Sequence, residues 1–344
     1  MKRRSSRRLL GWPTAIVLVI GLVLCWYILV GKAQLPVGTG PAGPAVPLEP
    51  FTYVWSTDRT VLLGLGDSIT KGFGASRKHS YFELLIENDD LWYPDMKGRD
   101  LKHVFPNLDF LNYSVSYTVS ERHLTHQVPR VNRYASAVNG IVVITTGGND
   151  LIHDYGRSPP RDGAMYGCTY EQASEWKANF RQRLEAIVEA VISKFPGGCE
   201  IFLANIYDPT DGVGDIEKAN IRLPPWQDGL RALSLFNAVI TDICGSYENV
   251  HLVDIHSQFL GHGIHCRDRR NRYYRRDDPH YWYFDNLEDP NDRGYDAIRR
   301  LFLIQIMRVF AGQPQEVLTG TGDSSRDVMS IAPQEQVQPR DIAT

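Results

Sequence analysis

Short apolar runs alternate with longer amphipathic stretches along the middle of this 344-residue chain. The runs are bounded by glycine, proline or polar residues, which is typical of strands buried on both faces. They lie at residues 61–66, 108–113, 140–146, 200–205 and 250–254. This pattern predicts a mainly parallel sheet of about five strands.

Between the runs, apolar residues recur at spacings of three and four, the period of an amphipathic helix. The longest such stretch extends from Glu171 to Phe195, and Pro196-Gly197-Gly198 ends it. Further helices are expected at residues 81–86, 230–243 and 292–310. Strands alternating with helices indicate βαβ units and therefore an α/β fold.

The amino terminus has the pattern of a membrane segment. Five of the first eight residues are basic, and no charged side chain occurs from Leu9 to Val30. A helix of that length reaches roughly 33 Å, enough to cross a bilayer. The basic flank predicts a cytoplasmic amino terminus and an extracytoplasmic domain, periplasmic or at the cell surface. A cleaved signal peptide is the alternative.

Composition divides the chain into four parts. Residues 1–33 form the basic start and the membrane anchor or signal peptide, and residues 34–50 are rich in proline and glycine and are expected to be a linker. The folded domain is expected at 51–312. Residues 313–344 are polar and are expected to be a disordered tail.

Net charge and cysteine content limit the classes of binding partner and the disulfide bonds that this chain can be expected to have. The formal net charge is −3, and because the first 32 residues contribute six positive and no negative charges, the remainder carries −9. An acidic domain argues against nucleic acid as a partner. Outside the membrane the domain's four cysteines allow disulfides, but each is equally typical of a small buried residue. They are Cys168, Cys199, Cys244 and Cys266.

Two polar turns follow two of the predicted strands. Ser68 comes directly after the apolar run that ends in Gly66, and Asn149 follows the run that ends in Thr146. Ligands collect at the carboxyl edge of an open α/β sheet. A serine nucleophile and an amide donor at one edge are two of the parts that covalent ester hydrolysis needs.

The string Gly66-Asp67-Ser68-Ile69-Thr70 resembles the first block of the GDSL or SGNH family of serine hydrolases, and Gly147-Gly148-Asn149-Asp150 resembles its Gly-x-Asn-Asp block. This resemblance implies a three-layer, flavodoxin-like fold with Ser68 as nucleophile. It also implies that the Asn149 amide and the backbone N–H of Ser68 line the oxyanion hole. The family's ester chemistry requires no cofactor.

The second block departs from the family pattern. Laying residues 112–118 on the family's Asn-x-x-x-Ser-Gly turn puts Tyr117 at the glycine position. Tyr117 still has a backbone N–H that can donate to an oxyanion, but it lacks the freedom of glycine at positive φ.

The last block leaves alternatives for the base. Asp277-Asp278-Pro279-His280 fits the family's Asp-x-x-His spacing, with His280 as base and Asp277, or else Asp278, orienting it. The family's His-Pro-Asn continuation instead aligns with Asp289-Pro290-Asn291, which puts Asp289 at the histidine position. Three further histidines are weaker candidates as base, or as ligands of a metal site with Asp254 and His280: His256, His262 and His265.

The sequence therefore predicts a membrane-anchored, extracytoplasmic serine esterase or lipase without metal or cofactor. Its substrates are expected to be carboxyl esters of lipids or of acylated polysaccharide. Two alternatives stay open on the same fold: a catalytically weak binding module at the cell envelope, and an acyltransferase.

Overall fold

The computed structural model describes residues 12–26, 35–219 and 223–311, so the expected tail lies outside the described residues. Five strands form one parallel sheet in the order β2-β1-β3-β4-β5. This order is that of the flavodoxin-like doubly wound fold, which confirms the predicted fold class. The strands are β1 Arg59–Gly66, β2 Leu108–Asn112, β3 Val138–Thr145, β4 Cys199–Ala204 and β5 Val250–Val253.

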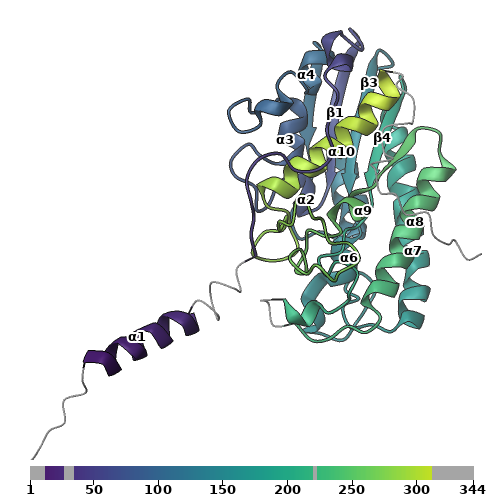
Figure 1. Cartoon of the computed structure of the whole chain (residues 1–344). Helices are drawn as coiled ribbons and strands as arrows, with labels where there is room; N and C mark the ends of the chain where they lie inside the picture. Colours follow the sequence, from purple (N-terminus) through teal and green to yellow (C-terminus); the bar gives the residue numbers. More distant parts are fainter. Residues whose placement is uncertain (1–11, 27–34, 220–222, 312–344) are drawn as a thin grey trace, which may run out of the picture.

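Helices cover both faces of the sheet (Figure 1). The α-helices of the domain are α2 Ser68–Lys71, α3 Tyr81–Ile86, α4 Leu101–Val104, α5 Ser120–Arg122, α6 Gly148–Ile152, α7 Tyr170–Ile192, α8 Gly229–Ser246, α9 Ile255–Phe259 and α10 Asp292–Phe310. Short turns of other helical types are η2 Glu49–Thr52, η3 Pro94–Met96, η4 His123–Gln127, η5 Val128–Arg130, η6 His153–Gly156 and η7 Ile216–Lys218.

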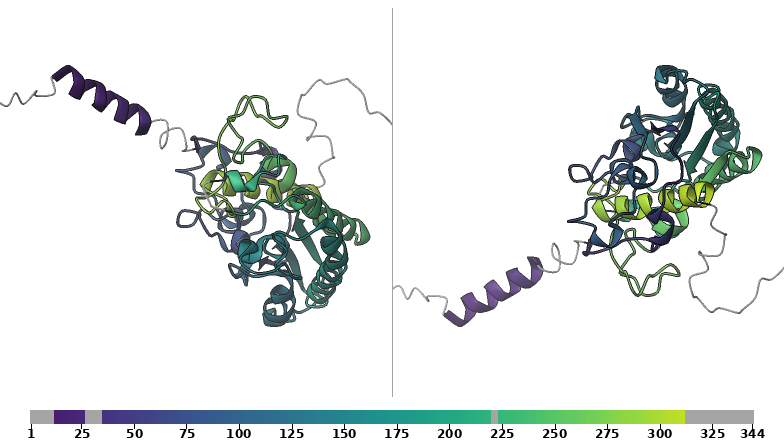
Figure 2. Two further views of the ribbon diagram at one scale, coloured as in Figure 1. Left: turned by 90° about the horizontal axis from the view of Figure 1, so that it is seen from below. Right: turned by 90° about the horizontal axis from the view of Figure 1, so that it is seen from above.

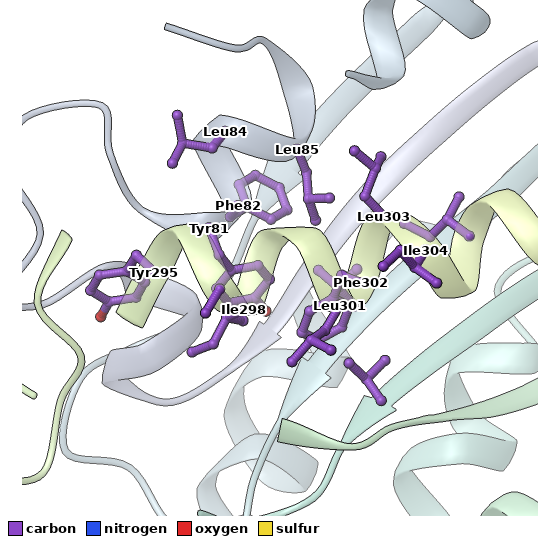
Figure 3. Packing of buried hydrophobic residues seen from close by; sticks show 14 of the residues in the cluster. Tyr81, Phe82, Leu84, Leu85, Tyr295, Ile298, Leu301, Phe302, Leu303 and Ile304 are labelled. Atoms are coloured by element: carbon purple, nitrogen blue, oxygen red, sulfur yellow. The ribbon is translucent and has the colours of Figure 1, made fainter. Parts of the chain in front are cut away.

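Alternate strand residues point into two separate cores, as the period of two requires. Leu62 of β1 and Val143 of β3 pack with α3 and α10, whereas Leu63 and Val142 pack with α7 and α8. Figure 2 shows α7 and α8 on the side of the sheet away from α10. Figure 3 shows the α10 side, where Tyr81 of α3 stacks on Phe302 of α10 with ring centroids 4.7 Å apart.

The segment expected to be a free linker packs on the domain instead. The backbone N–H of Ala42 donates to Asp296 in α10 at 3.0 Å, and Arg293 donates to the carbonyls of Thr39 and Gly40. Ala42 and Val46 are buried. We call residues 35–50 the strap. Its prolines and glycines leave backbone carbonyl and N–H groups available for hydrogen bonds with polar side chains of α10.

Helix α1, Trp12–Trp26, forms part of the predicted anchor. Its large apolar side chains are exposed, and it extends away from the domain in Figure 1. Among the described residues, no helix has both the length and the apolar character needed to cross a membrane. The remaining parts of the predicted segment, 9–11 and 27–30, lie outside the described residues.

The cysteines are unpaired in this structure. Cys168, Cys199 and Cys266 are buried, and burial raises the pKa of each thiol. They are therefore small core residues here.

Candidate active site

The turn after β1 presents Ser68 at the carboxyl edge of the sheet. Gly66 has φ +128°, and a Cβ built there would lie 2.2 Å from the carbonyl oxygen of Thr145, so only glycine fits between β1 and β3. Asp67 caps α2 by accepting from the N–H of Ile69 at 3.1 Å. Ser68 is consequently the first residue of α2, at the end of a central strand.

Asp67 is buried beneath the turn. The hydroxyl of Thr145 donates to its Oδ1 at 2.7 Å, and Thr145 in turn contacts Thr70 at 2.8 Å. Burial raises the pKa of Asp67 to about 7, with a smaller contribution from the negative charge of Asp289. This carboxyl group fixes the turn through hydrogen bonds to β3 and α2.

Gln127 holds the same turn from the other side. Its Oε1 accepts from the N–H of Gly66 at 2.8 Å, and its Nε2 donates to the carbonyl of Gly66 at 2.7 Å. The side-chain amide thus adds to the backbone N–H of Val115, which donates to the same carbonyl at 3.1 Å. No local pattern around Gln127 in the sequence indicates a contact 61 positions away, so its role could not be predicted from sequence.

Asn149 lies in α6, directly after β3, and lines the same cavity as Ser68. Its Nδ2 donates to the carbonyl of Thr118 at 3.0 Å, which joins the second and third sequence blocks. Asp150 beside it is fully buried and accepts from both the N–H and the hydroxyl of Ser120. The structure therefore brings Ser68 and Asn149 to one edge, as the sequence predicted.

Tyr117 adopts the left-handed conformation expected of the glycine it replaces, with φ +67°. Its ring packs on His153 at 4.2 Å between centroids, and its hydroxyl contacts Asp154 at 3.3 Å. Neither its N–H nor that of Ser68 donates a hydrogen bond to another described residue. The tyrosine thus keeps the backbone geometry of the family turn while its side chain points to the surface.

His280 lies against the strap. Its Nδ1 contacts Asp278, not Asp277, and Asp278 also accepts two hydrogen bonds from Arg293 at 2.7 Å. The ring packs against Gly38. No hydrogen bond joins His280 to Ser68 in the described chain, and His280 is not among the residues that line the cavity at Ser68. The structure does not bring these two residues together.

Asp289 faces Ser68 instead. The Ser68 hydroxyl and the Asn286 amide are the two hydrogen-bond neighbours that lower its pKa, against a larger increase caused by burial. Asn286 donates to Oδ2 at 2.6 Å. Oδ1 is buried and has no hydrogen-bond partner among the described residues.

The three remaining histidines after β5 each have a structural contact. His256 Nδ1 contacts the carbonyl of Ile206 at 2.8 Å, and His265 Nε2 contacts Asp215 at 2.8 Å. His262 stacks on Trp282 with 3.4 Å between ring centroids, and burial lowers its pKa to about 4. Within the described ranges, no three His, Cys, Asp or Glu side chains converge as a metal site.

A cavity opens beside Ser68 and runs between α6, α8 and the loop after β4. Ser68, Asn149 and Glu288 supply polar groups at it, and burial raises the pKa of Glu288 to about 8. Most of its wall is apolar, including Leu151, Ile152, Ile206, Trp226, Leu230 and Leu233. An apolar group bound there would lie next to the Ser68 hydroxyl.

Solved structures similar to this chain include three hydrolases. An extracellular lipase from Streptomyces rimosus is 17% identical, with a TM-score of 0.46, over 72% of this chain and 99% of that one. A psychrotrophic esterase from Pseudoalteromonas sp. is 17% identical, with a TM-score of 0.42, over 74% and 100%. A family 3 carbohydrate esterase from Clostridium thermocellum is 15% identical, with a TM-score of 0.39, over 74% and 100%.

Among curated proteins, none matches this chain. The sequence model of the GDSL-like Lipase/Acylhydrolase family matches residues 65–297, which contain the Ser68 turn, the Asn149 turn and the start of α10. This match covers more than half of the chain. The protein therefore belongs to the GDSL-like lipase/acylhydrolase family, the esterase- and lipase-type hydrolases.

Proposed function

We propose that this protein is a serine esterase of the lipase type that cleaves carboxyl esters with an apolar acyl chain through an acyl-enzyme on Ser68. The observation that carries the proposal is the apolar cavity that begins at Ser68. An apolar wall contributes to binding by burying methylene groups, and an acetyl group has none. The apolar wall therefore favours a longer acyl chain over acetyl groups alone.

Three donors support the acyl-transfer chemistry. In this proposal the N–H groups of Ser68 and Tyr117 and the Nδ2 of Asn149 donate to the oxyanion; Ser68 and Asn149 line the same cavity. Removal of one such donor in a serine hydrolase costs on the order of 10²–10³ in kcat. The positive φ of Tyr117 supports its N–H as a donor, because the turn keeps the direction that a glycine would give it.

The proposed substrates are esters of lipids, with acylated polysaccharide as the second class. Lipid esters are preferred because the cavity wall is apolar on several sides, from α6, α8 and the loop after β4. The proposed location, beside a membrane and outside the cytoplasm, would give the site access to both classes.

Membrane attachment through the amino terminus is part of the proposal. The support comes from the sequence: Leu9–Val30 carries no charge, follows five basic residues and extends beyond both ends of α1. The full chain is expected in the membrane pellet and resistant to carbonate extraction, whereas a chain that starts at residue 35 is expected in the supernatant. Full-length protein in the supernatant would overturn the attachment.

The acyl-chain proposal is tested with a series of p-nitrophenyl esters from acetate to decanoate. We expect kcat/KM to rise at least tenfold from acetate to the longer chains. Leu230→Trp places a large ring in the cavity and should abolish this preference while leaving acetate hydrolysis within threefold. Ala238→Trp, on the exposed face of α8, is the matched control and should change neither.

The same assay separates the alternatives. Binding of the esters without turnover would favour a binding module. Products formed on an added alcohol in preference to water would favour an acyltransferase. A flat profile in the wild-type protein would contradict the proposed acyl pocket.

A further inference from the structure

Residues 283–291 form a fixed arm that leads from the aromatic core to α10. The N–H of Phe284 donates to the carbonyl of Asp289 at 2.7 Å, and Tyr283 pairs with Pro290 as an isolated antiparallel bridge. Asn291 caps α10 and donates to the carbonyls of Tyr281 and Tyr283. The backbone at Asp289 is therefore held on both sides.

The carboxylate of Asp289 is positioned as firmly as its backbone. Its side chain is almost fully buried, at 2% exposure, and the Asn286 amide holds Oδ2 at 2.6 Å. Oδ1 is buried and has no hydrogen-bond partner among the described residues, and the nearby Ser68 hydroxyl lowers the pKa of this carboxyl group. A buried carboxylate oxygen without a partner is costly, and a catalytic role is one explanation for such a group.

We propose that Asp289 is the general base that activates Ser68, an assignment that rests on the proposed esterase function. The carboxylate occupies the place where the family's sequence pattern has a histidine, and Asn286, three residues earlier, stands where that pattern has the orienting acid. The Ser-Asp pair then replaces the usual Ser-His-Asp triad.

The proton and electron balance of this pair is complete. Oδ1 of Asp289 takes the proton of the Ser68 hydroxyl while Oγ forms a bond to the ester carbonyl carbon, and the carbonyl π electrons move to the oxygen. When the oxyanion collapses, the bond to the alcohol oxygen breaks, and Asp289 gives that oxygen its proton. Water then attacks the acyl-enzyme with Asp289 again as base, which releases the acid and restores Ser68.

The surroundings of Asp289 make its carboxylate more basic than an exposed one. Burial raises its pKa, and the groups that face it are acidic or phenolic: Asp67, Glu288, Tyr207 and Tyr295. None of these neighbours is a cation that would stabilise the carboxylate. A base whose pKa is closer to that of a serine hydroxyl takes up the hydroxyl proton at a lower cost in free energy.

His280 does not compete for this role in the structure. An acid, Asp278, holds its Nδ1 as a base histidine requires, but its ring packs on Gly38 of the strap and no hydrogen bond joins it to Ser68 in the described part of the chain. The Ser68 cavity is lined on that side by Asn286, Leu287 and Glu288 instead.

The test is the rate of Ser68 labelling by a fluorophosphonate in the full chain, measured for wild type, Asp289→Asn and His280→Asn. We expect Asp289→Asn to label at least 100-fold more slowly and His280→Asn to stay within threefold of wild type. Asp289→Asn keeps the side-chain shape and removes a buried charge, so its melting temperature should not fall.

Two further measurements keep the assignment falsifiable. Asn286→Asp with Asp289→His restores the family's acid and histidine, and should recover labelling at least tenfold over Asp289→Asn. In wild type, the pH at which the labelling rate is half-maximal should be the same in cold and in warm buffer. The ionisation enthalpy of a carboxyl group is small, whereas that of an imidazole is large and would shift this midpoint with temperature.

The outcomes distinguish this inference from the proposed function. Labelling of folded Asp289→Asn within threefold of wild type overturns the inference, and a loss confined to His280→Asn assigns the base to His280. A folded wild-type protein that is neither labelled nor hydrolyses any ester overturns the proposed function and the base together.

Discussion

Tyr117 occupies a backbone conformation that most side chains avoid. An L-residue in the left-handed region costs roughly 1–2 kcal/mol relative to the right-handed one, whereas glycine adopts both. The ring compensates in part by packing on His153 and by its hydroxyl contact with Asp154. The two effects can be separated by substitution.

Replacing Tyr117 by alanine removes the ring and keeps the strain, whereas replacing it by glycine removes both. We therefore expect Tyr117→Gly to have a free energy of unfolding about 1 kcal/mol higher than Tyr117→Ala. Urea denaturation of the two variants measures the difference. Equal stabilities would show that the positive φ at this position carries no strain.

The site could be predicted from sequence only where its parts are local. Ser68 and Asn149 each sit in a glycine turn directly after an apolar strand, and the parallel sheet brings such turns together. Gln127 acts through a contact 61 residues away, which no periodicity indicates. Asp289 could be found from the alignment of the last block, but that alignment did not decide between it and His280. The assignment of His280 as base and of Asp277 as its partner stays a prediction; in the structure, Asp278 is the acid at His280.

Helix α10 is buried on almost every side, including its charged residues. Asp296 accepts from Arg299 at 2.7 Å and from Arg300 at 3.0 Å, and it also accepts from the N–H of Ala42 in the strap. Both arginines are buried. Asp296 thus pairs with both arginines, of which Arg300 also pairs with Asp95 at 2.7 Å, and it holds the strap on the helix.

Asp296→Asn should therefore be strongly destabilising, because it removes the anion that buried Arg299 binds and leaves buried Arg300 with Asp95 alone. The expected loss is about 3–5 kcal/mol in the free energy of unfolding. Asp242→Asn breaks an exposed ion pair with Arg181 and is the matched control, expected to cost less than about 1 kcal/mol. Denaturation of both variants measures this. A loss at Asp296 as small as that of the control would contradict the role given to it.

The strands and long helices were predictable because each has a regular spacing of apolar residues within one short stretch of sequence. All five strands occur where the apolar runs indicated, and α10 has the predicted bounds. The strap was not predictable in this way. Its residues have no period and little bulk, and its place depends on polar groups of α10 that are more than 250 residues away in sequence.

For the whole molecule, the buried carboxyl groups near Ser68 link stability to pH. Burial raises the pKa of Asp67 from 3.8 to about 7 and that of Glu288 from 4.5 to about 8. Above about pH 4.5 the unfolded chain has released the protons of these two carboxyl groups, whereas the folded state still holds them. Stability from these groups is fully present below pH 4 and is lost as the pH rises through 7 and 8.

We expect the free energy of unfolding to fall by at least ~1 kcal/mol between pH 5.5 and pH 8.5, with Glu288 supplying a large part. Glu288→Gln removes that titration, so its stability should change less over this range and exceed wild type at pH 8.5. Glu248→Gln, at an exposed position, should follow the wild-type curve. A wild-type stability that rises over this range would contradict the burial of protonated carboxyl groups.

The central claim is that Ser68 is an activated nucleophile, and it is tested most directly by mass spectrometry of the full chain after reaction with a fluorophosphonate. The account predicts one adduct, on the peptide that contains Ser68, absent from Ser68→Ala and retained in Ser234→Ala on the exposed face of α8. A folded wild-type protein with no adduct, or with its adduct on another residue, would contradict the account.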